Sequence, residues 1–236
     1  MTVGPRYVLD PTNPDPTIIQ RAARTLQRGG IVAYPTDTVY GLAVDPYNES
    51  AVARLYAAKQ RPAEKAVPLI IGAVAQLQDV CGHIPPVAGR LIEAFWPGPL
   101  TLLLEPQACI PTLVRGHSAR IGVRWPASPI SQALAVALGR AITASSANRS
   151  GLPAALCAAD VVTQLAQEVD MILDGGAVAD AEVSTVLDVL AESLCIVRAG
   201  KIRQRVIEDV LGRRIRDVSA TGGGDECIAK PPSLSL

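Results

Sequence analysis

The chain has 236 residues, a formal net charge of zero and 49% apolar residues, but only 3% aromatic residues. This length suits one large domain or two small ones, and the core must be built from Ala, Val, Leu and Ile. Such a composition is typical of an α/β enzyme and argues against an aromatic base-stacking platform. The neutral charge also provides no global basic field for nucleic acid.

The cysteines and histidines argue against a zinc site or a disulfide framework. The five cysteines are scattered without a CxxC pair, and there are only two histidines. We therefore expect no metal ligands and reduced thiols, as in a cytoplasmic protein. The N-terminus has prolines and acids where a signal peptide needs an apolar run, and no apolar span of about 18 residues occurs, so we expect no membrane association.

The predicted elements alternate between helices and strands. In chain order we expect a helix at 15–28, a strand at 31–34, a loop at 35–42, a helix at 48–59, a strand at 67–71, a helix at 85–96, strands at 97–104 and 120–126, a helix at 128–139, a strand at 141–144, a helix at 160–167, strands at 171–173, 184–190 and 194–200, and a helix at 204–211. The first helix has the clearest start and stop signals, with Asp15 as N-cap, Pro16 at its first position and Gly29 after its end.

This alternation predicts a single α/β domain over about residues 5–215. The segment 216–236 is polar and rich in Gly and Pro, and we expect it to be a disordered tail. No Walker-type GxxxxGK[ST] or GxGxxG fingerprint occurs in the expected domain, so a nucleotide site would need less standard residues.

The sequence "KQRP" places Lys59 and Arg61 two residues apart, just before Pro62. Residues i and i+2 of a helix point in different directions, but Pro62 disfavours helical backbone at Arg61. If the segment is extended, both cations lie on one face and can converge on one anion. The alternative is that both simply favour the negative end of the helix macrodipole.

Three other places are candidates for ligand contacts. The segment "TASSANRSG" (143–151) ends a strand with small hydroxyl and amide residues, and "PTDTVYGL" (35–42) carries Thr36, Thr38 and Tyr40. Both segments suit a polar ligand, and both also suit ordinary turns and caps. Arg124 and Arg198 end two apolar strands, where a cation faces either a ligand crevice or a surface ion pair.

Seven motifs in order, "PTDTVYGLAVDP", "AAKQRP", "FWPGPLTLLL", "RIGVRWP", "ASSANRSG", "STVLDV" and "IVRAGKI", resemble the YrdC-like family, the threonylcarbamoyl-adenylate synthases. The resemblance covers about residues 15–203 and implies a short, single-domain form. It implies a twisted mixed β-sheet with flanking helices around a concave cleft. It also implies a nucleotidyltransferase that uses L-threonine, bicarbonate and ATP, with Mg²⁺ on the phosphates, to make L-threonylcarbamoyl-AMP and pyrophosphate.

The implied product feeds the N6-threonylcarbamoyl modification of adenosine 37 in tRNA. The implied partners are therefore downstream threonylcarbamoyl-transfer proteins, with direct tRNA contact as a further prediction. The family's KxR and SxN signature is matched by Lys59, Arg61, Ser146 and Asn148, which the resemblance makes the catalytic set, with Lys59 at the reacting centre. It assigns ATP binding to Arg61, Lys65, Arg120, Ser146, Asn148 and Arg198, and threonine binding to Thr38, Arg124, Ala144 and Ser184. Arg124 would pair with the amino-acid carboxylate.

Three positions depart from the family pattern. Gly72 stands where many relatives have His, Lys65 where they have Asn, and Arg120 where they have Thr. These departures keep open a paralogue that uses another carbamoyl acceptor, as in the carbamoylation domains of hydrogenase maturation. A basic stretch from Arg198 to Arg216 keeps open an RNA-binding or ribosome-maturation module.

Overall fold

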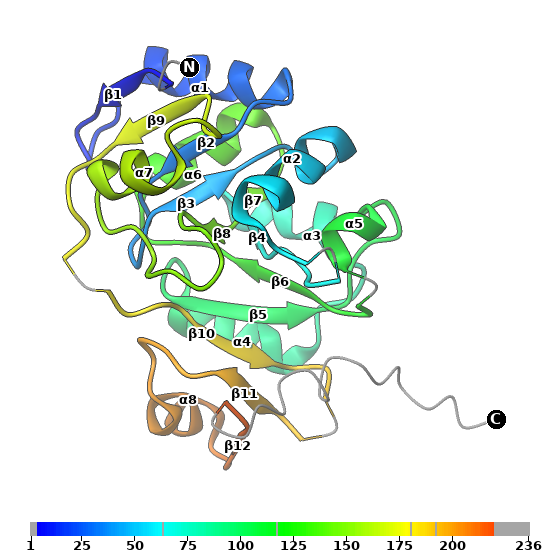
Figure 1. The fold of residues 1–236 in the computed structure, drawn as a ribbon. Coiled ribbons are helices and arrows are strands. Elements are labelled where there is room, and N and C mark those ends of the chain that lie inside the picture. Colours follow the sequence, from blue (N-terminus) through cyan, green and yellow to red (C-terminus); the bar gives the residue numbers. More distant parts are fainter. Residues whose placement is uncertain (1–3, 63, 117, 180, 192, 220–236) are drawn as a thin grey trace.

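The computed structural model describes residues 4–62, 64–116, 118–179, 181–191 and 193–219. Within them, helices flank two mixed β-sheets, which confirms the predicted mixed α/β class (Figure 1). The expectation of one sheet was too simple, since the strands divide into sheets of five and seven. Residues 220–236 of the predicted tail lie outside the described residues, and strand β12 (Arg216–Asp217) lies just past the predicted boundary at 215.

The five-stranded sheet has the order β1-β9-β2-β3-β8. Its strands are β1 (Arg6–Val8), β2 (Val32–Tyr34), β3 (Gly41–Ala43), β8 (Ser145–Ser146) and β9 (Met171–Asp174). The pairs β1–β9 and β9–β2 are parallel, whereas β2–β3 and β3–β8 are antiparallel. Strand β3 falls at the end of the predicted loop 35–42, so this loop is shorter than the sequence indicated.

The seven-stranded sheet has the order β12-β11-β10-β5-β6-β4-β7. Its other strands are β4 (Leu69–Ile70), β5 (Leu100–Leu104), β6 (Ile121–Arg124), β7 (Ile142–Thr143), β10 (Thr185–Asp188) and β11 (Cys195–Arg198). Parallel and antiparallel pairs alternate across it, beginning with the parallel pair β11–β12 at one edge. Arg124 and Arg198 are the last residues of β6 and β11, as the sequence predicted.

The two sheets meet where the chain passes from β7 to β8. Only Ala144 separates these strands, and its backbone N–H donates to the Pro68 carbonyl 2.7 Å away. The Thr143 hydroxyl donates to the Leu42 carbonyl and accepts from the Val44 N–H, at 3.0 and 2.9 Å. These bonds join the segment between β7 and β8 to β3 and to the segment before β4, which places Ala144 at the junction of the two sheets.

Side-chain caps mark the starts of three of the longer helices. The helices are α1 (Pro16–Gln27), α2 (Glu49–Lys59), α3 (Leu77–Val80, after a 3₁₀ turn at Val74–Gln76), α4 (Pro86–Phe95), α5 (Thr112–Arg115), α6 (Pro129–Leu138), α7 (Ala158–Leu165) and α8 (Gln204–Leu211). The side chains of Asp15, Asn48 and Ser128 accept backbone N–H groups at the starts of α1, α2 and α6. No described helix is long and apolar enough to cross a membrane.

Two apolar clusters form the core. Helices α1 and α6 pack on one face of β2 and β9, with Leu26, Tyr34 and Leu134 among the buried side chains. Helices α2 and α7 cover the other face, and the same cluster continues under α4 and α8 beside the second sheet. Because both faces of β2 are covered, all its residues are buried, and the strand reads as a continuous apolar run.

Candidate active site

A cleft opens beside the junction of the two sheets. It consists of three adjoining cavities of about 770, 160 and 260 Å³. The first and second share Arg124, Ala144, Ser184 and Arg198 in their walls, and the second and third share Arg61 and Ser146. The eleven residues predicted to form the site all line these cavities: Thr38, Lys59, Arg61, Lys65, Arg120, Arg124, Ala144, Ser146, Asn148, Ser184 and Arg198.

The charge of the cleft is strongly positive although the chain is neutral. Six cations line it: Lys59, Arg61, Lys65, Arg120, Arg124 and Arg198. Among the described residues of the same walls the one carboxylate is Glu64. Two further carboxylates, Asp37 and Asp188, pair with Arg124 and Arg120. An excess of cations in a concave site attracts and binds anions.

Lys59 reaches the cleft from the end of α2 and is 3% exposed. Its ammonium group donates to the backbone carbonyl of Ser146, and to the carbonyl and side-chain oxygens of Asn148 at 2.7 and 3.1 Å. Burial lowers the pKa of Lys59 to about 7, and the nearby Arg61 acts in the same direction. Three oxygen acceptors match the three N–H groups of the ammonium, so these contacts favour the charged form.

The route by which Lys59 and Arg61 come together differs from the predicted one. Gln60 adopts the left-handed conformation, with φ of 53° and ψ of 43°, and is therefore not extended. The Arg61 guanidinium folds onto the following loop, where it donates to the Ala66 carbonyl at 2.9 Å. Both side chains line the 260 Å³ cavity, but Lys59 turns to Asn148 and Arg61 to the loop. Their predicted convergence on one anion stays a prediction.

Ser146 and Asn148 form a fixed polar pair opposite Lys59. The Ser146 hydroxyl donates to the Asn148 side-chain oxygen at 2.6 Å. The Asn148 amide nitrogen donates to the carbonyls of Arg149 and Leu152, at 3.0 and 2.6 Å. These contacts use both amide hydrogens, so the orientation of Asn148 is determined. The Ser146 oxygen retains lone pairs that can accept from a ligand.

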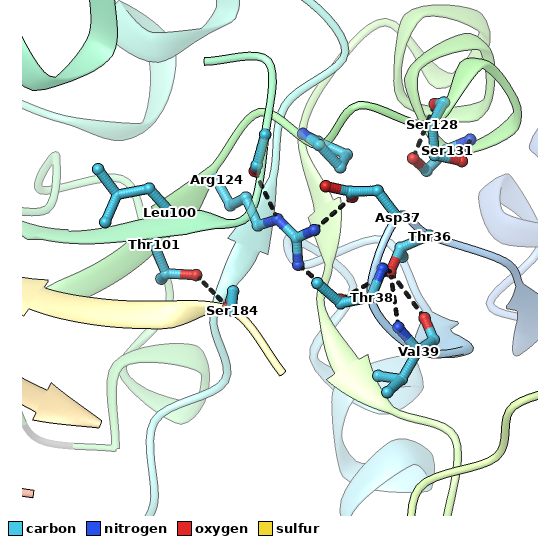
Figure 2. A network of polar contacts seen from close by, with 12 residues as sticks. Thr36, Asp37, Thr38, Val39, Leu100, Thr101, Arg124, Ser128, Ser131 and Ser184 are labelled. Carbon is cyan, nitrogen blue, oxygen red and sulfur yellow. Dashed lines mark hydrogen bonds and ion pairs between the residues drawn. The ribbon is translucent and has the colours of Figure 1, made fainter. Parts of the chain in front are cut away.

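Arg124 lies at the centre of the network in Figure 2. Its Nε donates to the Gly98 carbonyl at 3.0 Å, its Nη1 to the Thr38 hydroxyl at 2.9 Å, and its Nη2 to the Asp37 carboxylate. Burial lowers the pKa of Arg124, and Asp37 opposes this shift. A guanidinium has five N–H groups, so one on each terminal nitrogen is left for a ligand.

Arg198 stands next to Arg124 in the walls of two cavities. Its guanidinium donates to the carbonyl oxygen of Ser184 at 2.8 Å and to the Ser184 hydroxyl at 2.9 Å, and that hydroxyl also contacts Thr101 at 2.8 Å. Burial lowers the pKa of Arg198 to about 10, with a further contribution from Arg124. Two neighbouring guanidinium groups, of which Arg124 pairs with the Asp37 carboxylate, favour an anion in this space.

Arg120 is held by a buried ion pair. Its Nε lies 2.8 Å from Asp188 Oδ2, and the two side chains are 9% and 0% exposed. The other Asp188 oxygen accepts the backbone N–H groups of Leu190 and Ala191, at 2.9 and 3.2 Å. Sequence reasoning missed Asp188 and Asp37 because each pairs with an arginine far away in the chain. The one sign of them in the sequence was that each lies within a matched motif, Asp37 in "PTDTVYGLAVDP" and Asp188 in "STVLDV".

The packing around Gly72 has no room for a larger residue. A Cβ atom there would lie 2.4 Å from the Gln132 carbonyl oxygen and 2.7 Å from a Val136 methyl group. The Gly72 N–H donates to the Gln76 side chain at 2.7 Å, and its carbonyl accepts from the Trp125 indole at 3.0 Å. Gly72 does not line any of the three cavities. Lys65 is exposed at the rim of two of them.

Comparisons with known proteins show the family of the chain. A family model, Sua5/YciO/YrdC, described as "Telomere recombination", matches residues 24–200. The chain belongs to this family. Two relatives called threonylcarbamoyl-AMP synthase come from Pyrococcus abyssi and Vibrio cholerae. They are 36% and 37% identical over 92% and 77% of this chain, which cover 63% and 97% of the relatives.

A solved structure of a family member has a similar fold. The crystal structure of P. abyssi Sua5 complexed with L-threonine is 33% identical and superposes with a TM-score of 0.85. The match covers 94% of this chain and 64% of the Sua5 chain, so the chain spans about two thirds of that family member. The YrdC-like resemblance of the seven sequence motifs is thereby confirmed.

Proposed function

We propose that the protein is an L-threonylcarbamoyl-AMP synthase, which converts L-threonine, bicarbonate and ATP into L-threonylcarbamoyl-AMP and pyrophosphate. The observation that supports this most is the cleft in which six cations face cavities of about 770, 160 and 260 Å³. The reaction gathers a triphosphate, a bicarbonate and an amino-acid carboxylate, so it needs positioning and positive potential above all. The relatives' name agrees with this chemistry.

The reaction has two bond-forming steps. The threonine nitrogen attacks the carbon of bicarbonate, and loss of water leaves a carbamate. A carbamate oxygen then attacks the α-phosphorus of ATP, and pyrophosphate leaves with the electrons of the broken P–O bond. Both steps bring negative charges together, which the cations of the cleft stabilise.

The proposed roles combine the family resemblance with the residues of the cavity walls. We assign the threonine side to the 160 Å³ cavity, whose walls include Thr38, Arg124, Ala144 and Ser184. Arg124 has two N–H groups left for the substrate carboxylate, and the acidic Asp37 keeps its guanidinium in place. We assign ATP to the two larger cavities, with Arg61, Lys65, Arg120, Ser146, Asn148 and Arg198 in their walls.

The role of Lys59 follows from its three acceptors. Because its N–H groups are all engaged with Ser146 and Asn148, Lys59 holds the SxN segment in place and adds positive charge to the reacting centre. Direct contact of its ammonium with bicarbonate or the carbamate requires one of these bonds to open. We therefore expect Lys59 to act mainly through charge and position.

Magnesium belongs to this proposal as a companion of ATP. No group of three or more His, Cys, Asp or Glu suited to a metal occurs among the described residues. The described cavity walls supply one carboxylate, Glu64. The residues therefore do not fit a protein-held Mg²⁺, and the ion would arrive on the phosphates of the nucleotide. Contact with tRNA, the downstream transfer proteins, the cytoplasmic location and the catalytic unit at 5–215 stay predictions.

Pyrophosphate release tests the proposal. Purified protein with Mg²⁺, ATP, bicarbonate and L-threonine is expected to release pyrophosphate, and omission of any one substrate is expected to abolish it. Release that persists without threonine would indicate a simple ATPase. Release with another amino acid in place of threonine would favour the paralogue with a different acceptor.

A further inference from the structure

Two threonine hydroxyls lie side by side next to Arg124. The Thr36 and Thr38 hydroxyl oxygens are 3.0 Å apart, and either could be the donor in this contact. The Thr36 hydroxyl also lies 2.7 Å from the Val39 carbonyl oxygen. Thr38 is 2% exposed and lines the 160 Å³ cavity together with Thr36.

A count of hydrogens decides the direction of this contact. A threonine hydroxyl has one hydrogen and two lone pairs. A carbonyl oxygen can only accept, so the short contact to Val39 takes the single hydrogen of Thr36. The contact between the two hydroxyls then needs the hydrogen of Thr38. The N–H groups of Thr38 and Val39 also point to the Thr36 oxygen, at 3.1 and 3.2 Å, so the Thr38 hydrogen shares the two lone pairs of this oxygen with two longer contacts.

The same count leaves the Thr38 hydroxyl with one unused lone pair. Its hydrogen points to Thr36, and one lone pair accepts from Arg124 Nη1 at 2.9 Å. The remaining lone pair can accept one hydrogen bond, and the hydroxyl has no hydrogen left to donate. A ligand group that meets Thr38 in the cavity must therefore be a donor.

Arg124 has the opposite character at the same place. Its contacts with Gly98, Thr38 and Asp37 leave two N–H groups, so it can only donate. At this wall of the cavity, the two remaining N–H donors of Arg124 lie beside the one remaining acceptor position of Thr38. An amino acid matches this arrangement. Its carboxylate can only accept and suits Arg124, whereas the neighbouring nitrogen, and the hydroxyl of threonine, can donate to Thr38.

We infer that Thr36 is a positioning residue for amino-acid binding: it takes up the Thr38 hydrogen, so that Thr38 accepts from the amino or hydroxyl group of the substrate while Arg124 donates to its carboxylate. This inference rests on the proposed function, which supplies the amino acid. It assigns to Thr36 a role beyond closing the turn before β3, since the turn alone does not require the hydrogen of Thr38.

Thr36→Val and Thr36→Ser form a matched pair for the test. Valine keeps the shape and removes the hydroxyl, whereas serine keeps the hydroxyl and removes the methyl group. Isothermal titration of L-threonine in the presence of ATP is expected to show a Kd that rises roughly 3- to 10-fold for Thr36→Val and changes less than about twofold for Thr36→Ser. The Kd of ATP alone is expected to stay within about twofold in both.

A general loss of structure would weaken ATP and threonine binding together, and that result would overturn the inference. An unchanged threonine Kd in Thr36→Val, or an equal loss in Thr36→Ser, would also overturn it. If Thr36→Val does not fold, Thr38→Val leaves the Thr36 turn in place and is expected to give the same selective loss. Titration needs no turnover, so absent pyrophosphate release with intact threonine binding would contradict the proposed reaction while leaving this inference standing.

Discussion

Replacement of Arg124 by lysine separates the threonine side of the cleft from the ATP side. The guanidinium makes three bonds in three directions, to Gly98, Thr38 and Asp37. A lysine ammonium carries the same charge at a single point and cannot span this fork. Asp37 would keep the ammonium as its partner, so the bonds to Gly98 and Thr38 and the paired contact with the substrate carboxylate would be lost.

The magnitude follows from these contacts. Loss of charge-assisted hydrogen bonds on this scale costs about 2–4 kcal/mol of transition-state stabilisation, which is a decrease of roughly 30- to 900-fold in kcat/KM for threonine. The KM for ATP is expected to change less than about threefold, because Arg120, Asn148 and Arg61 are untouched.

Steady-state pyrophosphate release, with threonine varied at saturating ATP and then the reverse, measures both parameters. Arg203→Lys is a suitable control, since Arg203 is 71% exposed in a surface ion pair with Glu182 and is expected to behave as the wild type. A rise in the ATP KM with an unchanged threonine KM would refute the assignment of Arg124 to the amino acid.

Three further predictions concern stability. Because burial lowers the pKa of Lys59 from 10.5 to about 7, the unfolded chain binds more protons between these pH values, and the free energy of unfolding should rise with pH across this window. Urea titrations should show this rise weakened in Lys59→Met, by at most about 5 kcal/mol, and parallel profiles would contradict it. Asp188→Asn removes the carboxylate that forms a buried ion pair with Arg120 and should lower the unfolding free energy by about 3 kcal/mol, with thermal melts as the measurement. Gly72→Ala should cost about 1–3 kcal/mol because its Cβ would lie 2.4 Å from a carbonyl oxygen, whereas Gly89→Ala, with open space around it, should not destabilise the chain.

Local signals in the sequence predicted the six longer helices, but not the four-residue helices α3 and α5. Asp15, Asn48 and Ser128 are caps whose partners lie within three residues, so their meaning does not depend on the rest of the chain. The division into two sheets was not predictable in this way. Strands of two or three fully buried residues, such as β4 and β7, show no alternation and do not indicate their neighbours.

The sequence predicted which residues line the cleft, but it predicted less of their geometry. The eleven residues named from the motif match all line the cleft. Seven motifs in a fixed order identify a family, whereas the spacing of residues within a single motif does not. Helix α2 ends at Lys59, as Pro62 predicted, yet the backbone then turns through a left-handed Gln60. The pairing of Asp37 with Arg124 joins residues 87 positions apart, which local rules cannot predict.

Transfer of bicarbonate carbon into a nucleotide product tests the central proposal most directly. The protein is incubated with ¹³C-bicarbonate, L-threonine, ATP and Mg²⁺, the products are separated, and their masses are measured by mass spectrometry. We expect an adduct of AMP and threonine that contains one ¹³C atom, formed in equal amount with pyrophosphate. Pyrophosphate or AMP without a labelled threonine adduct would contradict it.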